Sequence, residues 1–154
     1  KGFYNYSEGS RAPNPAPENE EIYRSVSAAN GIERRDISDE EIIDRCILAL
    51  VNEGADIIEE GVGQRAADLD VVYINGYGFP IWRGGPMHHA NAMGMSQVLN
   101  KLNKYYELTK SDTFKPASLI KKLAEIDGKF GDAPVKEDRK EKLSFSESSV
   151  AGNL

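Results

Sequence analysis

The chain has 154 residues, enough for one compact domain, and its 40% hydrophobic and 29% charged residues are typical of a soluble globular protein. The 25 Asp and Glu outnumber the 19 Lys and Arg, and the formal net charge of −6 argues against general attraction to nucleic acid or an anionic membrane. No apolar run approaches the roughly twenty residues of a spanning helix, so we expect no membrane span. The one cysteine, Cys46, has apolar neighbours and is interpreted as a small core residue in a reducing compartment.

The first segment, residues 1–18, predicts an extended connecting arm. It holds three aromatic residues and then alternate prolines, which remove amide donors and favour an extended path. A helix is expected from Glu20, because Ile22, Val26 and Ala29 fall on one face, and Gly31 is placed to end it in a left-handed conformation.

A long core helix is predicted from Asp39 to Gly61. Ser38 is its expected N-cap, with Glu41 three residues later to reach back. Gly54 stands where close helix packing would need a missing side chain. The apolar positions that follow the helical period are Ile43, Cys46, Ile47, Leu50, Val51, Ile57 and Ile58.

The middle of the chain is harder to interpret. Residues 66–75 fit a strand or a helix equally well on pattern alone, because β-prone residues also follow one helical stripe. Residues 76–86 are rich in glycine and large rings, which predicts an ordered loop anchored to a core by its aromatic side chains.

Three shorter helices complete the prediction. Pro86 suits the first position of a helix that ends at Gly94, Ser96 is the expected cap of the next, and Pro116 is expected to open the last one, before Gly128. Residues 131–154 are too polar to bury and predict a flexible tail. The residues therefore predict an all-α chain of about six helices.

No complete catalytic set is evident. Gly76-Tyr77-Gly78 lacks the third glycine of a dinucleotide loop, and His88 and His89 point about 100° apart on a helix, which disfavours a shared metal. Carboxylate pairs such as Asp68 and Asp70 are interpreted as structural or solvated in preference to acid/base catalysts. Asn52 and Glu53 are expected to be buried and to anchor a loop. Arg83 is expected to bind its own loop's carbonyls, with a phosphate or carboxylate ligand as the alternative.

Four runs together closely resemble the C-terminal helical domain of 3-hydroxyacyl-CoA dehydrogenases. They are Ala49–Gly54, Glu59–Gly61, Asp68–Asp70 and the loop Gly76–Pro86. The resemblance is narrowest to the second, terminal copy of that domain in the multifunctional fatty-acid oxidation enzymes, and the opening Lys1–Tyr6 resembles the junction between the two copies. It implies an all-α fold like the C-terminal domain of 6-phosphogluconate dehydrogenase, with a helix over 66–75. The implied limits are a connecting arm at 1–18, the helical domain at 19–130 and the polar tail at 131–154.

The same resemblance implies that the catalytic His and Glu and the NAD site lie in a domain outside this chain. Asp44 stands where the catalytic copy carries a substrate-contacting Asn, which indicates a non-catalytic copy. We therefore expect no cofactor, metal or catalytic residue in this chain, with NAD bound elsewhere in the parent. The expected structural and interface residues are Asp44, Asn52, Glu53, Gly76, Gly78, Phe79, Pro80, Trp82, Arg83, Gly84, Gly85 and Pro86.

Expected partners are the rest of the same polypeptide and, through it, an acyl-CoA substrate. The isolated chain is expected to self-associate through the face that would otherwise contact its partner copy. A docking module for a thiolase subunit is the alternative function. The expected location is the bacterial cytoplasm, with the peroxisome as the alternative. Trp82 is expected to be buried, so that its removal would cost about 3 to 5 kcal/mol.

Overall fold

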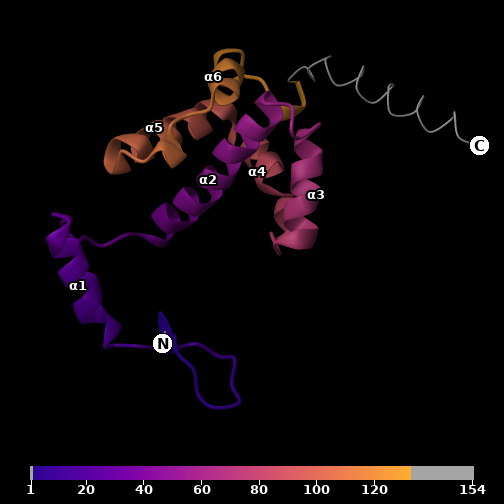
Figure 1. The fold of residues 1–154 in the computed structure, drawn as a ribbon. Helices are drawn as coiled ribbons and strands as arrows, with labels where there is room; N and C mark the ends of the chain where they lie inside the picture. Colours follow the sequence, from indigo (N-terminus) through magenta and orange to yellow (C-terminus); the bar gives the residue numbers. More distant parts are fainter. Residues whose placement is uncertain (1, 133–154) are drawn as a thin grey trace, which may run out of the picture. The chain divides into compact units, whose positions relative to one another are not determined.

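The computed structural model describes residues 2–132, and these divide into two compact units, one up to Ser38 and one from Asp39 onward (Figure 1). The predicted domain limits at residues 19 and 130 stay predictions. Most of the predicted tail, residues 133–154, lies outside the described residues.

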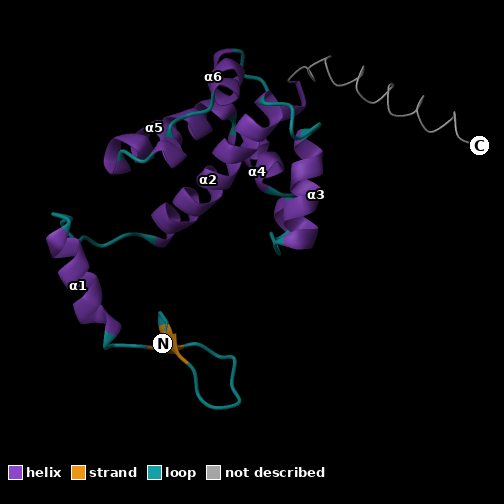
Figure 2. Cartoon of the chain, in the orientation of Figure 1, coloured by secondary structure: helices purple, strands orange, loops and turns teal. Residues whose placement is uncertain are grey.

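The first unit contains a small β-ribbon and one helix. Strands β1 (Tyr4–Asn5) and β2 (Asn14–Pro15) pair antiparallel, and helix α1 (Asn19–Ala29) follows (Figure 2). Polar contacts join them: the Asn19 side-chain amide donates to the carbonyls of Gly2 and Phe3 at 3.0 and 3.2 Å. As predicted, Gly31 adopts a left-handed conformation just after the helix.

All regular secondary structure in the described part of the second unit is helical, which confirms the all-α prediction. Residues 66–76 form a helix, as the resemblance implied and the pattern alone did not decide. The elements in chain order are α2 (Asp39–Glu59), α3 (Ala66–Gly76), the 3-10 turn η1 (Ile81–Arg83), α4 (Pro86–Met93), α5 (Met95–Thr109), η2 (Asp112–Phe114), α6 (Ser118–Glu125) and η3 (Phe130–Asp132).

The long helix α2 is the centre of this unit, and α4, α5 and α6 pack against it (Figure 1). The buried residues of α2 recur at helical spacing and therefore form one face of the helix. The close approach predicted at Gly54 is confirmed, since a Cβ there would lie 2.6 Å from Met87 Sδ on α4. The most fully buried hydrophobic side chains include Leu48, Val51, Met87, Met95, Val98, Leu102, Tyr105 and Ile120.

Three side chains on α2 lie outside the core, contrary to prediction. Cys46, Ile43 and Glu53 are exposed. The buried face runs through Leu48 and Ala55, and at 100° per residue each of the three falls well over a quarter turn from it. Apolar neighbours in sequence therefore did not predict burial, because position around the helix decides it.

Two helix starts also differ from the prediction. Helix α5 begins at Met95 with Gly94 at its N-cap, so Ser96 lies inside the first turn. Helix α6 begins at Ser118, two residues after Pro116. Over the described range, every helix is too short or too polar to cross a bilayer.

Candidate functional site

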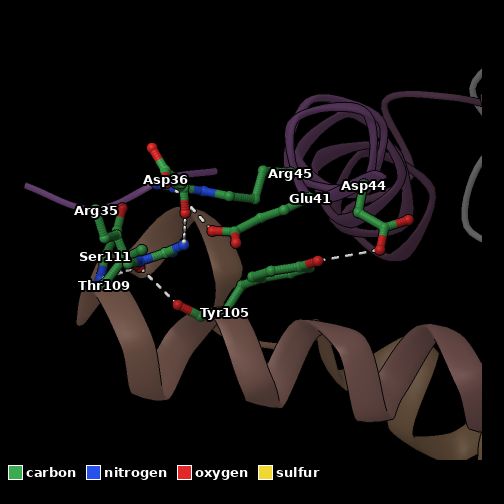
Figure 3. Close-up of polar contacts among 8 residues, drawn as sticks. All are labelled: Arg35, Asp36, Glu41, Asp44, Arg45, Tyr105, Thr109 and Ser111. Atoms are coloured by element: carbon green, nitrogen blue, oxygen red, sulfur yellow. Dashed lines mark hydrogen bonds and ion pairs between the residues drawn. The ribbon is translucent and has the colours of Figure 1, made fainter. Parts of the chain in front are cut away.

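The buried carboxylate of Asp44 joins helices α2 and α5. Its Oδ2 atom accepts a hydrogen bond from the Tyr105 hydroxyl at 3.0 Å (Figure 3) and one from Lys101 Nζ at 2.5 Å. Lys101 and Tyr105 lie four residues apart on α5, so they share the face that meets α2. Two donors from one helix thus hold a carboxylate of the other.

The electrostatics of this group oppose acid/base chemistry. Burial, then the hydrogen bond to Asp44, raises the pKa of Tyr105 to about 12, and the same carboxylate raises the pKa of Lys101. Burial and the nearby Arg83 lower the pKa of His89, while Asp44 acts in the opposite direction. Near neutral pH the phenol keeps its proton, the ammonium keeps its charge and the carboxylate is engaged by both. The arrangement is a structural tie between helices.

Asn52 makes a second tie, from α2 to the segment that leads into α6. Its amide donates to the carbonyls of Thr113 and Lys115 at 3.2 and 2.9 Å, and its oxygen accepts from the Ala117 N–H at 2.9 Å. The prediction that Asn52 is buried and anchors a loop is confirmed.

Asp70 makes a third tie: the sequence left it as structural or solvated, and its role as a cap of α4 was not predicted. Its buried carboxylate accepts hydrogen bonds from the backbone N–H groups of Met87 and His88, at 2.7 and 3.0 Å, and so caps the first turn of α4. Burial raises the pKa of Asp70, and the two backbone hydrogen bonds partly offset that shift. The signal was Gly85 at the N-cap, because a glycine offers no capping side chain and another acceptor has to supply the bond.

The two glycines before α4 are required by this geometry. Gly84 and Gly85 have φ values of +75° and +98°, and a Cβ on either would lie within 2.5 Å of His88 or Asp70 atoms. Gly78 also has a positive φ, +71°. Gly76 has neither a positive φ nor a close neighbour, so nothing in the structure requires glycine there.

One aromatic ring anchors the loop to the core. Phe79 is buried, and its N–H donates to the carbonyl of Tyr73 at 3.0 Å, which folds the loop against the end of α3. Pro86 is buried at the start of α4, whereas Pro80 is exposed.

Trp82 does not anchor the loop, contrary to prediction. Its side chain is 75% exposed, and the guanidinium of Arg83 lies 4.4 Å from its ring centroid. Arg83 therefore covers the neighbouring indole, and no carbonyl partner for it occurs among the described residues. The neighbouring Ile81 and Tyr77 are 77% and 76% exposed.

We group the exposed apolar side chains of α3 and the following loop under one name, the α3–η1 surface. It is formed by Val71 and Val72 of α3 together with Tyr77, Ile81 and Trp82 of the following loop. Helix α3 is apolar on more than one side: Leu69 contacts the core, whereas the exposed Val71 lies about 160° around the helix from it. A helix that is apolar on both sides is typical of one buried on both sides.

The described residues do not offer a metal or dinucleotide site. No group of three potential ligands among His, Cys, Asp and Glu occurs in residues 2–132. Gly76-Tyr77-Gly78 follows helix α3, whereas a dinucleotide loop follows a strand.

Comparison with known proteins agrees with this fold. The family described as 3-hydroxyacyl-CoA dehydrogenase, C-terminal domain, matches residues 42–137. The chain is 38% identical over 125 residues to a peroxisomal bifunctional enzyme of Danio rerio and 37% identical over 139 residues to that of Homo sapiens, covering 80% and 89% of this chain. It is 31% identical over 129 residues to a fatty acid oxidation complex subunit alpha of Acinetobacter baylyi, covering 84% of this chain.

The chain spans 17 to 19% of the length of these relatives, which include peroxisomal and bacterial enzymes. The family match covers more than half of the chain and includes most of α2 and all of α3, α4, α5 and α6. This chain belongs to the family of 3-hydroxyacyl-CoA dehydrogenase C-terminal domains.

Proposed function

We propose that this chain is the terminal helical domain of a longer, multifunctional enzyme of fatty-acid β-oxidation. In that enzyme an NAD-dependent 3-hydroxyacyl-CoA dehydrogenase oxidises the 3-hydroxyl of an acyl-CoA to a ketone. The chain packs on the catalytic helical copy of its own family and supports the substrate cleft, without catalysing the reaction itself. The similarity to several long enzymes of this pathway supports the proposal. Because these relatives include peroxisomal and bacterial enzymes, the proposal holds for a longer enzyme of either kind.

The observation that carries the proposal is the α3–η1 surface. Val72, Ile81 and Trp82 are each more than half exposed, although transfer of their side chains out of water lowers the free energy. Exposed apolar side chains that stand close together mark protein interfaces, and Tyr77, Ile81 and Trp82 follow one another closely on one loop. Trp82 and Arg83 are residue types enriched at the energetic centres of interfaces, and they stand together on this loop.

The rigid support behind the surface fits a bracing role. Asp70 holds the start of α4, and Phe79 holds the loop against α3, so η1 is fixed at both ends. A surface with a fixed backbone loses little conformational entropy on packing, which strengthens association. Precise positioning of a neighbouring cleft requires such a support.

The tie at Asp44 supports the non-catalytic part of the proposal. A substrate-contacting group needs free hydrogen-bonding capacity toward the substrate, whereas Asp44 is buried and its Oδ2 atom already accepts from Lys101 and Tyr105. A fixed negative charge also disfavours negative charge developing on a nearby thioester or enolate oxygen.

Complementation tests the bracing role. The longer polypeptide is prepared without this region, and the 154-residue chain is added back while NADH formation from a 3-hydroxyacyl-CoA is followed. We expect turnover to be restored by the wild-type chain and lost with the double variant Val72→Asp/Trp82→Asp. The control Val62→Asp changes an equally exposed apolar residue outside the α3–η1 surface and should restore turnover.

Two outcomes oppose the proposal. Unchanged dehydrogenase turnover with loss of thiolase association would assign the chain to the docking role instead. NADH formation by the 154-residue chain alone would show that it is an independent enzyme.

A further inference from the structure

Helix α1 carries an apolar stripe that its own unit leaves in solvent. Ile22 and Val26 lie one turn apart and are 57% and 55% exposed, and Ala29 continues the same side of the helix. No residue of α1 is buried. An isolated helix of eleven residues is marginal in water, so a helix this short normally depends on packing of its apolar side.

The polar side of α1 already has its partners. Glu20 accepts from Arg24 at 3.1 Å and from Arg34 at 3.2 Å, so it binds both its own helix and the segment after it. At the N-terminal end Phe3 stacks on Tyr23 with ring centroids 6.1 Å apart. The polar contacts of α1 thus lie on its other sides, and the Ile22–Val26 stripe stays exposed.

The comparisons indicate what kind of partner covers it. The family match begins at residue 42 and leaves α1 out. The matches to the long relatives cover 80 to 89% of the chain, which is more than residues 39–154 make up, so they extend into the first unit. The match to the human relative leaves out too few residues to exclude α1, so this helix lies within the similarity to a long polypeptide but outside the family match.

From these observations we infer that α1 docks its Ile22–Val26 stripe into an apolar groove on another domain of the longer polypeptide. The spacing i, i+4, i+7 is that of a helix-in-groove contact, in which one helical face supplies the anchors. This contact is a second anchor, separate from the α3–η1 surface, and it rests on the proposed function only because both require a longer polypeptide.

Hydrogen exchange followed by mass spectrometry tests the inference on the intact longer polypeptide and on the 154-residue chain. We expect peptides from residues 19–29 to exchange at least tenfold more slowly in the longer polypeptide. The variant Val26→Glu should abolish this protection, and because Glu favours helix more than Val, the change does not weaken α1 itself.

Ala28→Glu is the matched control. Ala28 is exposed and lies about 200° around the helix from Val26, so the same charge on that side should leave the protection intact. Equal exchange in the two proteins, or protection that survives Val26→Glu, overturns the inference. Protection of the 154-residue chain that rises with its concentration also overturns it, because a second copy would then cover the stripe.

The two proposals fail separately. Val26→Glu should leave exchange in residues 66–83 unchanged, and Val72→Asp/Trp82→Asp should raise exchange there while α1 stays protected. Loss of α1 protection in both variants would mean that α1 has no anchor of its own.

Discussion

Asp70 and Gly85 are in such close contact that no side chain fits between them. A Cβ on Gly85 would lie 2.3 Å from Asp70 Oδ1, and the same carboxylate caps α4 through the Met87 N–H. Two features therefore require glycine at position 85: the close contact with Asp70 leaves no space for a side chain, and a φ of +98° is one that other residues rarely adopt.

Replacing Gly85 with Ala should lower the free energy of unfolding by at least about 2 kcal/mol, from backbone strain and displacement of the Asp70 cap. Urea denaturation of the 154-residue chain measures this. Gly76→Ala is the control: Gly76 has no positive φ and no neighbour within 4 Å of a Cβ, so stability should stay the same or rise by up to about 1 kcal/mol. Equal effects of the two substitutions would mean that the Asp70 contact is unimportant.

Asn52→Ala should destabilise the chain by about 2 to 4 kcal/mol. The change leaves two carbonyls and one N–H, which now bond to the Asn52 side chain, without these hydrogen bonds. Glu53→Ala, at the next and exposed position, should change stability by less than about 0.5 kcal/mol. Thermal or urea unfolding of both variants measures the difference in stability. A small effect at Asn52 would show that water replaces these hydrogen bonds without loss of stability.

Tyr105→Phe should lower stability at neutral pH by about 1 to 3 kcal/mol, because the buried Asp44 carboxylate loses a donor. Tyr106→Phe is the matched control, because Tyr106 is a half-buried neighbour with Lys110 over its ring, and the change should cost less. The comparison requires only chemical denaturation at one pH.

The same tyrosine predicts the response to alkaline pH. Its pKa rises from 10.0 to about 12 on folding, so the folded chain holds the proton more tightly than the unfolded chain. This stabilisation is complete below about pH 10 and is lost as the pH rises toward 12. The raised pKa of Lys101 acts in the same direction, with stability lost above its usual value of 10.5. Ultraviolet titration should show a late tyrosinate step near pH 12 that is missing in Tyr105→Phe, and an unchanged titration curve would contradict the assignment.

Trp82→Ala should cost less than about 1 kcal/mol in the isolated chain, because the ring is exposed and its contact with Arg83 is a surface cation–π pair. The substitution should weaken self-association of the 154-residue chain, measured by analytical ultracentrifugation, because it removes the largest side chain of the α3–η1 surface. A wild-type chain that stays monomeric at high concentration would count against this use of the surface.

The sequence by itself determined most of the helices and several of their ends, although its pattern left residues 66–75 open between strand and helix. Ile22 and Val26 mark α1, Pro86 opens α4, and Gly31 takes the left-handed conformation at a helix end, because helical period and backbone restriction are local properties. The burial of Asn52 was predicted from its apolar helix neighbours, but the same reasoning was wrong for Glu53, because position around the helix decides which of the two is buried.

Only the tertiary structure decided which apolar and charged side chains are inside. Cys46 and Trp82 are exposed while Asp44 and Asp70 are buried, because burial depends on which side of a helix meets another element and on donors contributed from far along the chain. Tyr105 lies 61 residues from Asp44, and Met87 lies 17 from Asp70, so no local pattern contains either contact. Local sequence sets the shape of each helix, whereas packing between helices determines which carboxylates can be buried and which rings remain exposed for a partner.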